Sequence, residues 1–288
     1  MIKKLLIPLL LLSASSAQYS NKPILGTQIY EHDPSLVALW LMNEGAGNTV
    51  YDLSGNGHGT IVGGSWVAGY FGSALNLSGS GQYIDCGTST GGVIGGASSQ
   101  MSIVVWFKAD VTSGNDGIFS MTSFESSSGE ATLAIVSNTL RMYFNLTQLT
   151  APAFTDTSSW HQVVSTFNDP HGSLYLDGKL IGSGDVVGTL NFIGLKTIIG
   201  AYYSSSYPFD GQIDNVSVYN RVLSASEIAD LYREPFAMFE RPTPEMWVSA
   251  GEAPAATGQV IFMSTLPLWL VAILAVGMGY TNVKRKAA

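Results

Sequence analysis

Two short segments near opposite ends of the chain carry oxygen-bearing side chains among glycines. The first runs from Asp52 to Gly59 (DLSGNGHG), and the second runs from Phe209 to Arg221 (FDGQIDNVSVYNR). Ca²⁺ takes about six to eight oxygen ligands from carboxylates, amides and backbone carbonyls, and glycines let a loop curl so that its carbonyls point inward. The first segment therefore has the composition of a calcium loop, although Ser-Gly-Asn-Gly is also good turn chemistry without a metal.

The second segment predicts a strand with an irregularity around Asp214. Apolar residues follow one parity up to Ile213 and the opposite parity from Val216 onward. Because side chains alternate between the two faces of a strand, such a switch predicts a β-bulge between these residues. The bulge would re-aim the carboxylate of Asp214.

We therefore predict a Ca²⁺ site in which Asp52 and Asp214 supply carboxylates, with Asn56 and the carbonyl of His58 as further ligands. The alternative is that both aspartates are turn residues that cap a sheet without a metal. Zinc is not expected at His58, because no cysteine or second histidine stands at zinc-binding spacing.

A second candidate site is the tyrosine-rich segment 201–208 (AYYSSSYP). Aromatic faces on a polar loop suit stacking on a sugar or contact with a protein, so Tyr202, Tyr203 and Tyr207 are predicted ligand contacts. The alternative is that these tyrosines pack on the rim of the domain.

The elements that must position these residues are mostly strands. Apolar and β-branched runs predict strands at 36–42, 101–108, 131–136, 140–146, 160–167, 197–201 and 212–219. Asp177-Gly178 between apolar flanks predicts a hairpin over 174–181. Ser224 followed by Glu227 at the third helical position predicts the start of one short helix by a capping box. The regular spacing of the strands favours an all-β sandwich.

The two ends of the chain differ from the middle. Two lysines, an apolar run and small residues predict a signal peptide at 1–17, and an uncharged stretch before a basic cluster predicts a transmembrane helix at 259–281 with a cytoplasmic tail at 282–288. An uncleaved anchor and a buried apolar helix are the respective alternatives. Residues 18–34 form an irregular lead-in. Residues 235–258 form a proline-containing stalk, whose first half we expect to pack on the domain.

Charge and cysteine content narrow the class of partner. Residues 18–258 contain all 21 acidic residues and 8 Lys or Arg, which gives a net charge of −13. Such a surface repels nucleic acid and favours cations or neutral glycans. Cys86 is the single cysteine, so no disulfide forms within the chain.

Several motifs occur in an order that resembles the laminin-G-like (concanavalin-A-like) jelly-roll family over residues 35–234. They are LWLMNEG at 39–45, the Asp52 loop, Trp106, WHQVV at 160–164, LYLDGK at 174–179, GQID at 211–214, NRVLS at 220–224 and EI at 227–228. The resemblance implies two antiparallel sheets packed face to face, with adjacent chain ends and an acidic pair that binds calcium.

The resemblance also implies a binding function. We expect a non-catalytic recognition or adhesion module for a carbohydrate or a surface protein, exported and anchored in the cytoplasmic membrane with the domain outside. A structural surface protein of a cell, virion or envelope is the alternative. Relatives that hydrolyse glycans use Glu-x-Asp-x-x-Glu on one strand; this triplet, the Gly-x-Ser-x-Gly elbow, the P-loop and His-Glu-x-x-His are all missing from the sequence. We therefore expect no enzymatic activity.

Overall fold

The structure is a computed structural model that describes residues 33–90, 97–98, 100–122, 129–144, 147–186, 190–202 and 206–236. The predicted signal peptide, transmembrane segment and tail lie outside these ranges, as do the lead-in before Asp33 and the stalk after Phe236. Within the described ranges, no helix combines the length and the hydropathy that a membrane crossing requires.

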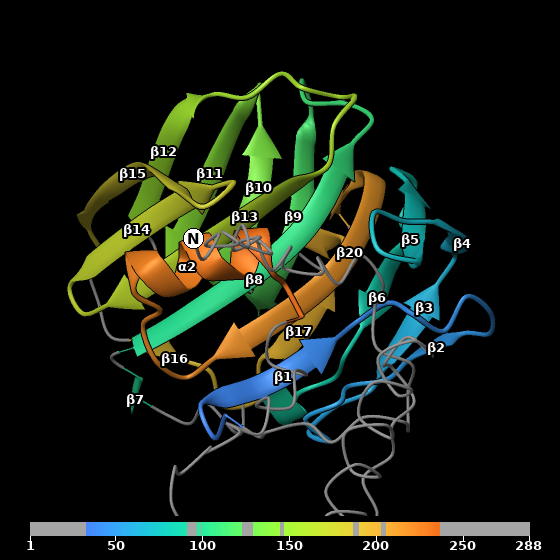
Figure 1. The fold of residues 1–288 in the computed structure, drawn as a ribbon, viewed down its shortest axis with the longest axis horizontal. Coiled ribbons are helices and arrows are strands. Elements are labelled where there is room, and N and C mark those ends of the chain that lie inside the picture. Colours follow the sequence, from blue (N-terminus) through green and yellow to red (C-terminus); the bar gives the residue numbers. More distant parts are fainter. Residues whose placement is uncertain are drawn as a thin grey trace, which may run out of the picture. The chain divides into compact units, whose positions relative to one another are not determined.

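Two antiparallel sheets make up the domain (Figure 1). The first sheet has the order β15-β14-β13-β8-β20-β5-β4, and β1 also pairs with β20. Its strands are β1 (Leu36–Trp40), β4 (Ser65–Ala68), β5 (Ser73–Ser78), β8 (Gln100–Ala109), β13 (His161–Asn168), β14 (His171–Leu176), β15 (Lys179–Asp185) and β20 (Asp210–Tyr219).

The second sheet has the order β12-β11-β10-β9-β17-β6-β3-β2. Its strands are β2 (Thr49–Val50), β3 (Gly59–Val62), β6 (Tyr83–Asp85), β9 (Asn115–Thr122), β10 (Gly129–Val136), β11 (Thr139–Phe144), β12 (Thr147–Ala153) and β17 (Lys196–Ile199). Two small ribbons pair β7 (Ala97–Ser98) with β16 (Leu190–Asn191) and β18 (Ala201–Tyr202) with β19 (Tyr207–Pro208). The predicted two-sheet antiparallel sandwich is confirmed.

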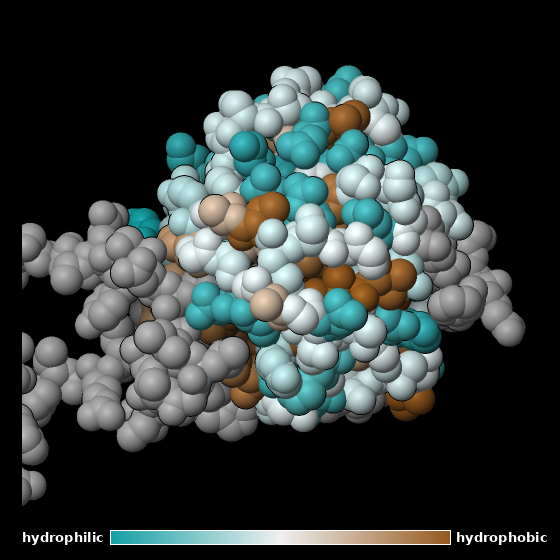
Figure 2. All heavy atoms as spheres, turned by 90° about the vertical axis from the view of Figure 1, so that its right-hand side faces the viewer, coloured by the Kyte–Doolittle hydropathy of each residue, from teal (hydrophilic) through white to brown (hydrophobic). Residues whose placement is uncertain are grey.

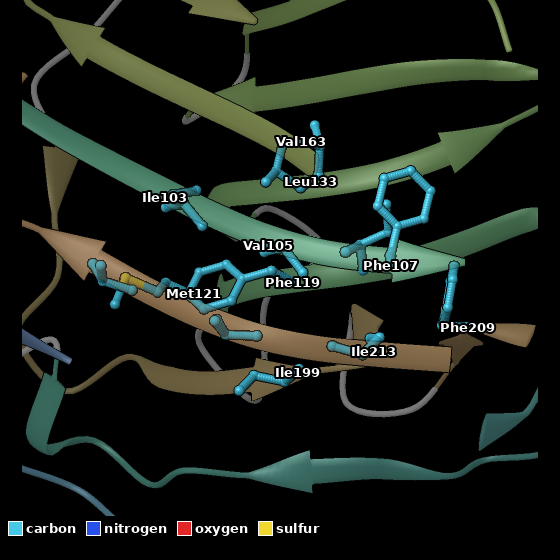
Figure 3. Close-up of a cluster of buried hydrophobic side chains, with 14 of the residues drawn as sticks. Ile103, Val105, Phe107, Phe119, Met121, Leu133, Val163, Ile199, Phe209 and Ile213 are labelled. Atoms are coloured by element: carbon cyan, nitrogen blue, oxygen red, sulfur yellow. The ribbon is translucent and has the colours of Figure 1, made fainter. Parts of the chain in front are cut away.

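The main core lies between the two sheets (Figure 3). Every second residue of β8 points into it, including Val105 and Phe107, and Phe119 of β9 meets them from the other sheet. At roughly 25 cal/mol per Å² of apolar surface, burial of such side chains is the main force that holds the sheets together.

A second apolar cluster covers the outer face of the first sheet. Val104 and Trp106 point outward from β8 and pack with Ile228 of the helix α2 (Ala225–Arg233). Because β8 is covered on both faces, its sequence is a continuous apolar run and not an alternating one. Phe236, near the start of the predicted stalk, is also buried in this cluster.

Three local predictions are confirmed. Asp177 and Gly178 both have positive φ angles, as a two-residue hairpin turn requires, and they join β14 to β15. Ser224 and Glu227 form a reciprocal capping box at the start of α2. The register of β20 against β8 shifts between Asp214 and Val216, where the bulge was predicted.

The bulge marks the point where β20 changes partner along one edge. Residues 210–213 pair with β5, while residues 216–219 pair with β1. Asn215, between these halves, has a φ of 39°. As a consequence, Asp214 and Asn215 lie where β5 and β1 diverge.

Candidate functional site: an aromatic platform above the strand bulge

The carboxylate of Asp52 is buried and is held by its own turn. Its Oδ1 accepts hydrogen bonds from the backbone N–H groups of Leu39 and Ser54, both at 2.9 Å. Its Oδ2 accepts from the N–H groups of Asn56 at 3.0 Å and Gly57 at 2.9 Å. The hydroxyl of Ser54 lies 2.8 Å from both oxygens as well, so hydrogen-bond donors saturate the roughly four lone-pair positions of the carboxylate. Asp52 therefore fixes the turn to β1.

The other residues predicted as ligands in this loop also face the turn. Nδ1 of His58 accepts the backbone N–H of Asp52 at 3.1 Å. Nδ2 of Asn56 donates to the carbonyl oxygen of Val37 at 3.0 Å. These contacts explain the residue types in the loop as hydrogen-bonded turn chemistry.

Asp214 is fully buried and lies against the loop between β4 and β5. Its Oδ2 lies 3.4 Å from the backbone nitrogen of Phe71. A Cβ atom added to Gly69 would stand only 2.8 Å from the same oxygen, so the loop needs a glycine there for its close approach. Asp214 thus helps to hold residues 69–71 over the sheet.

Asp52 and Asp214 therefore have different partners. Among the residues that the structure describes, no group of three or more His, Cys, Asp and Glu side chains is arranged to hold a metal ion. Ca²⁺ at Asp52, Asn56, His58 and Asp214 stays a prediction, and the geometry of Asp52 is accounted for without it.

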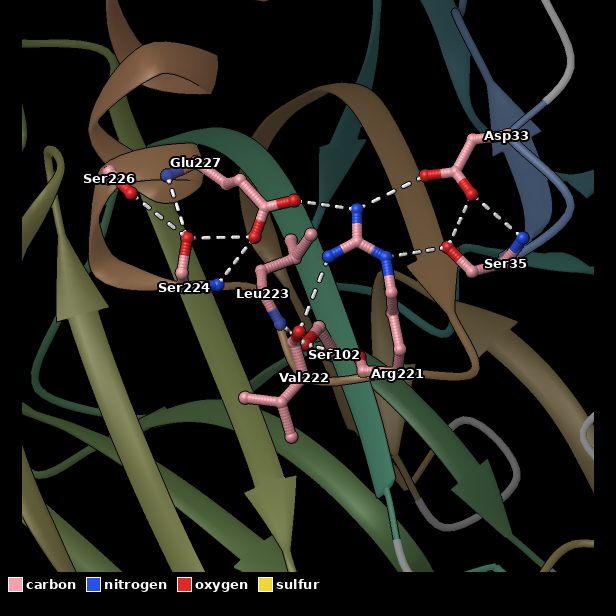
Figure 4. A network of polar contacts seen from close by, with 9 residues as sticks. All are labelled: Asp33, Ser35, Ser102, Arg221, Val222, Leu223, Ser224, Ser226 and Glu227. Carbon is pink, nitrogen blue, oxygen red and sulfur yellow. Dashed lines mark hydrogen bonds and ion pairs between the residues drawn. The ribbon is translucent and has the colours of Figure 1, made fainter.

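The two ends of the domain are joined by a guanidinium group (Figure 4). Arg221, just after β20, pairs with Glu227 of α2 at 2.7 Å and with Asp33 at 3.2 Å, and its Nε donates to Oγ of Ser35 at 2.8 Å. The hydrogen bond from Arg221 is the main reason that the pKa of Glu227 falls to about 2. This network connects the start of the described chain to its last helix.

Two of the three tyrosines of the second predicted site, Tyr202 and Tyr207, lie among the described residues. Tyr202 and Tyr207 stack on each other, with ring centroids 4.5 Å apart, and pack with Ala134 and Val136 on the outer face of the second sheet. Tyr202 is buried and Tyr207 is partly buried, which fits the alternative of packing on the domain. Tyr203 lies outside the described residues.

A more exposed aromatic group, which sequence reasoning did not single out, lies on the outer face of the first sheet. Trp106 of β8 is stacked with Tyr70 of the β4–β5 loop at 5.2 Å and with Tyr232 of α2 at 5.6 Å. Trp160, just before β13, lies 6.3 Å from Tyr70. We call Tyr70, Trp106, Trp160 and Tyr232 the aromatic platform.

Within the platform, the members differ in what they can contact. Trp106 is only 3% exposed, so it supports the other rings, whereas Tyr70 is 53% and Tyr232 is 37% exposed. The pKa of Tyr232 is raised, mainly by burial and then by the charges of Asp177 and Tyr70. The charge of Asp177 therefore acts on the platform. The sequence signal that could have revealed the platform is the Tyr70-Phe71 pair between two glycines, a loop pattern comparable to that of the tyrosine-rich segment.

The surface near the β4 and β5 edge is mixed in character. Where it is coloured in Figure 2, apolar side chains form small groups among polar ones. Small, separated apolar groups of this kind do not form one broad hydrophobic patch.

A sequence model described as the Concanavalin A-like lectin/glucanases superfamily matches residues 78–229. The chain belongs to this superfamily, and the predicted family resemblance is confirmed. Comparison with curated proteins gave no match.

Solved structures show the same fold at low sequence identity. Trypanosoma rangeli sialidase matches with a TM-score of 0.57 and 17% identity over 72% of this chain, which spans about a third (34%) of the sialidase chain. Domain 4 of AbnA, a GH43 extracellular arabinanase from Geobacillus stearothermophilus solved with arabinotriose, matches with a TM-score of 0.54 and 20% identity over 69% of this chain and 98% of that domain. The binding domain of Paraclostridial Mosquitocidal Protein 1 matches with a TM-score of 0.57 and 14% identity, over 71% of this chain and 53% of that chain.

Proposed function

We propose that this domain is a non-catalytic recognition module that binds a neutral carbohydrate through the aromatic platform. The observation that carries the proposal is the position of Tyr70: the ring is half exposed at the surface and rests on the buried ring of Trp106. A sugar has one face of C–H groups that packs on an aromatic ring and a rim of hydroxyls that stays in contact with water.

Two further observations support a carbohydrate over other ligands. The chain belongs to a superfamily of lectins and glucanases, and its fold matches that of an arabinanase domain solved with arabinotriose. The ring of Tyr70 is held by stacking on Trp106 and edge contact with Phe71, so little side-chain entropy is lost when a ligand packs on it.

The negative net charge of the protein favours a neutral carbohydrate over an anionic one. Residues 18–258 carry a net charge of −13, and Asp177 acts directly on Tyr232 of the platform. An anionic sugar would approach against this potential, whereas a neutral sugar would not. The predicted signal peptide and transmembrane segment support display of the domain outside the cytoplasmic membrane, anchored by residues 259–281.

The test is a glycan array probed with the wild-type protein, with Tyr70→Ala and with Tyr51→Ala. Tyr51 is a matched control because it is 47% exposed but packs against His58 and not against the platform. We expect Tyr70→Ala to weaken binding of neutral oligosaccharides about tenfold or more, as loss of one stacking contact predicts, and Tyr51→Ala to leave binding unchanged.

Other outcomes would point elsewhere. Binding that survives Tyr70→Ala would place the site away from the platform, and Tyr207→Ala, tested on the same array, would then show whether it lies on the second sheet. The absence of binding to any glycan would favour the second candidate, a structural surface protein with no soluble ligand.

A further inference from the structure

Beneath the platform, three adjacent strands bring polar side chains into one row on the outer face of the first sheet. Gln162 of β13 is in register with Trp106 of β8, which is in register with Asp214 of β20, and Asn215 follows in the bulge. The bulge is what places both Asp214 and Asn215 beside this outer row.

Three of these side chains are buried with polar atoms that have no hydrogen-bond partner among the described residues: Nε1 of Trp106, Oε1 of Gln162, and both amide atoms of Asn215. Their exposed fractions are 3%, 1% and 7%. Leaving a buried polar group unsatisfied is unfavourable, and three such side chains together would remove a large fraction of the stability of a domain.

The same three residues line one cavity of about 20 Å³, together with Leu39, Leu41, Val104, Ser217, Leu231, Pro235 and Phe236. A water molecule needs roughly 10–15 Å³ of such volume and two to four polar partners. This volume suits one water molecule.

We propose that this cavity is a binding site for one ordered water molecule, shared by Trp106, Gln162 and Asn215. The water accepts the indole N–H of Trp106 and donates to Oε1 of Gln162 and to Oδ1 of Asn215, so it pairs one polar atom of each side chain.

The site connects three elements. Nε2 of Gln162 donates to the carbonyl oxygen of Leu231 at 3.1 Å, near the end of α2, so the water links α2 through Gln162 to β8 and to the bulge of β20. It thereby orients the indole of Trp106, on which Tyr70 and Tyr232 stack. Trp106 is a positioning residue in this sense. That consequence rests on the proposed function, but the water site itself does not.

The direct test is a high-resolution crystal structure of the full chain. The proposal expects a water oxygen about 2.7–3.2 Å from Nε1 of Trp106, Oε1 of Gln162 and an amide atom of Asn215. A cavity without density, or one filled by a side chain or an additive, would overturn it. A water found without any glycan binding would leave the site standing while the proposed function fails.

An energetic test uses Gln162→Met and Asn215→Gly, singly and together, in denaturant unfolding. Glycine suits the positive φ of residue 215. Strand β8 separates the two positions, which puts their backbones roughly 10 Å apart and out of direct contact. Each substitution should increase the equilibrium constant of unfolding. If the two side chains share a water, the increase in the double variant should be smaller, by about fivefold or more, than the product of the two single increases. Effects that multiply within twofold would contradict a shared water.

Discussion

At the scale of single residues, Asp116 is a carboxyl side chain whose environment disfavours its negative charge. Asp116 is the first buried residue of β9, and only 7% of its surface is exposed. Its Oδ2 has no hydrogen-bond partner among the described residues. Burial, and then the charge of Asp210, raise its pKa from 3.8 to about 6. The folded protein therefore favours a protonated Asp116, which the unfolded chain does not.

We predict that this carboxyl makes the fold less stable as the pH rises. Between pH 3.8 and about 6 the folded state binds the extra proton, so stability decreases with pH across this window and stays lower above it. Asp116→Asn should remove the effect and stabilise the protein at pH 7 by up to about 3 kcal/mol.

The measurement is denaturant unfolding of wild type and Asp116→Asn at several pH values from 4 to 7.5. Glu234→Gln controls for the loss of one negative charge, because Glu234 is exposed. If wild type and Asp116→Asn keep a constant difference in stability over this range, the carboxyl of Asp116 is not protonated in the folded state at pH 4–6.

At the scale of elements, the sequence predicted what local chemistry determines. Continuous apolar runs identified β1, β8 and β13, the Asp177-Gly178 pair identified a hairpin, and Ser224 with Glu227 identified α2. The change of parity around Asp214 identified the bulge. Each of these signals lies within a few residues of the feature it predicts.

Other elements were not predicted because their signal depends on distant partners. Strands β3 to β6 are short, and β3, β4 and β5 each contain glycine or serine. These strands pair toward the edges of sheets whose other strands come from elsewhere in the chain. The aromatic platform combines Tyr70, Trp106, Trp160 and Tyr232 from four separate parts of the chain. Only the folded structure shows that these rings meet, or that Asp52 uses its oxygens within its own turn.

The Arg221 network makes a prediction at this scale, since it joins β20 to α2 and to the residues before β1. A lysine at position 221 keeps the charge but has no planar fork to reach Glu227, Asp33 and Ser35 together. These partners are about a third to two-fifths exposed, and solvent weakens their pairing, so we expect Arg221→Lys to lower stability by about 1 kcal/mol at pH 7.

The dependence of stability on pH, measured at acid pH, tests whether the pairing of Arg221 with Glu227 causes this loss. The pKa of Glu227 is lowered to about 2, so its contribution to stability is present above pH 4.5 and is lost as the pH falls toward 2. The difference between wild type and Arg221→Lys should therefore shrink at pH 2–3. Arg233→Lys is the control, because Arg233 pairs with Asp230 on an exposed helix surface. An equal loss in both variants would mean that the network adds nothing specific.

At the scale of the whole molecule, the question is what holds the two ends of the domain together. Among the described residues, β1 pairs with the second half of β20 and the Arg221 network joins the same two ends, while Asp52 accepts the N–H of Leu39 and so fixes β1 to the turn that follows it. The sequence predicted calcium for the same task. The two explanations differ in what they predict for Asp52.

If the carboxylate of Asp52 stabilises the turn through backbone N–H groups, Asp52→Asn should destabilise the domain by about 2 kcal/mol whether calcium is present or not. The amide keeps one acceptor oxygen, while its NH₂ group faces the N–H donors of Asn56 and Gly57 and leaves them unsatisfied. If Asp52 binds calcium instead, wild type should be more stable in excess Ca²⁺ than in chelator, and the variant should lose that increment.

Thermal and denaturant unfolding of wild type and Asp52→Asn, each with excess Ca²⁺ and with chelator, separates the two cases. Asp156→Asn is the matched control, since Asp156 accepts the N–H groups of Ser158 and Ser159 in an exposed turn and its loss should cost much less. We expect an equal loss in both conditions, because four N–H donors already occupy the oxygens that a cation would need. A calcium-dependent midpoint in wild type that disappears in Asp52→Asn would show instead that the turn opens to bind the ion, and calcium would then join the ends of the domain.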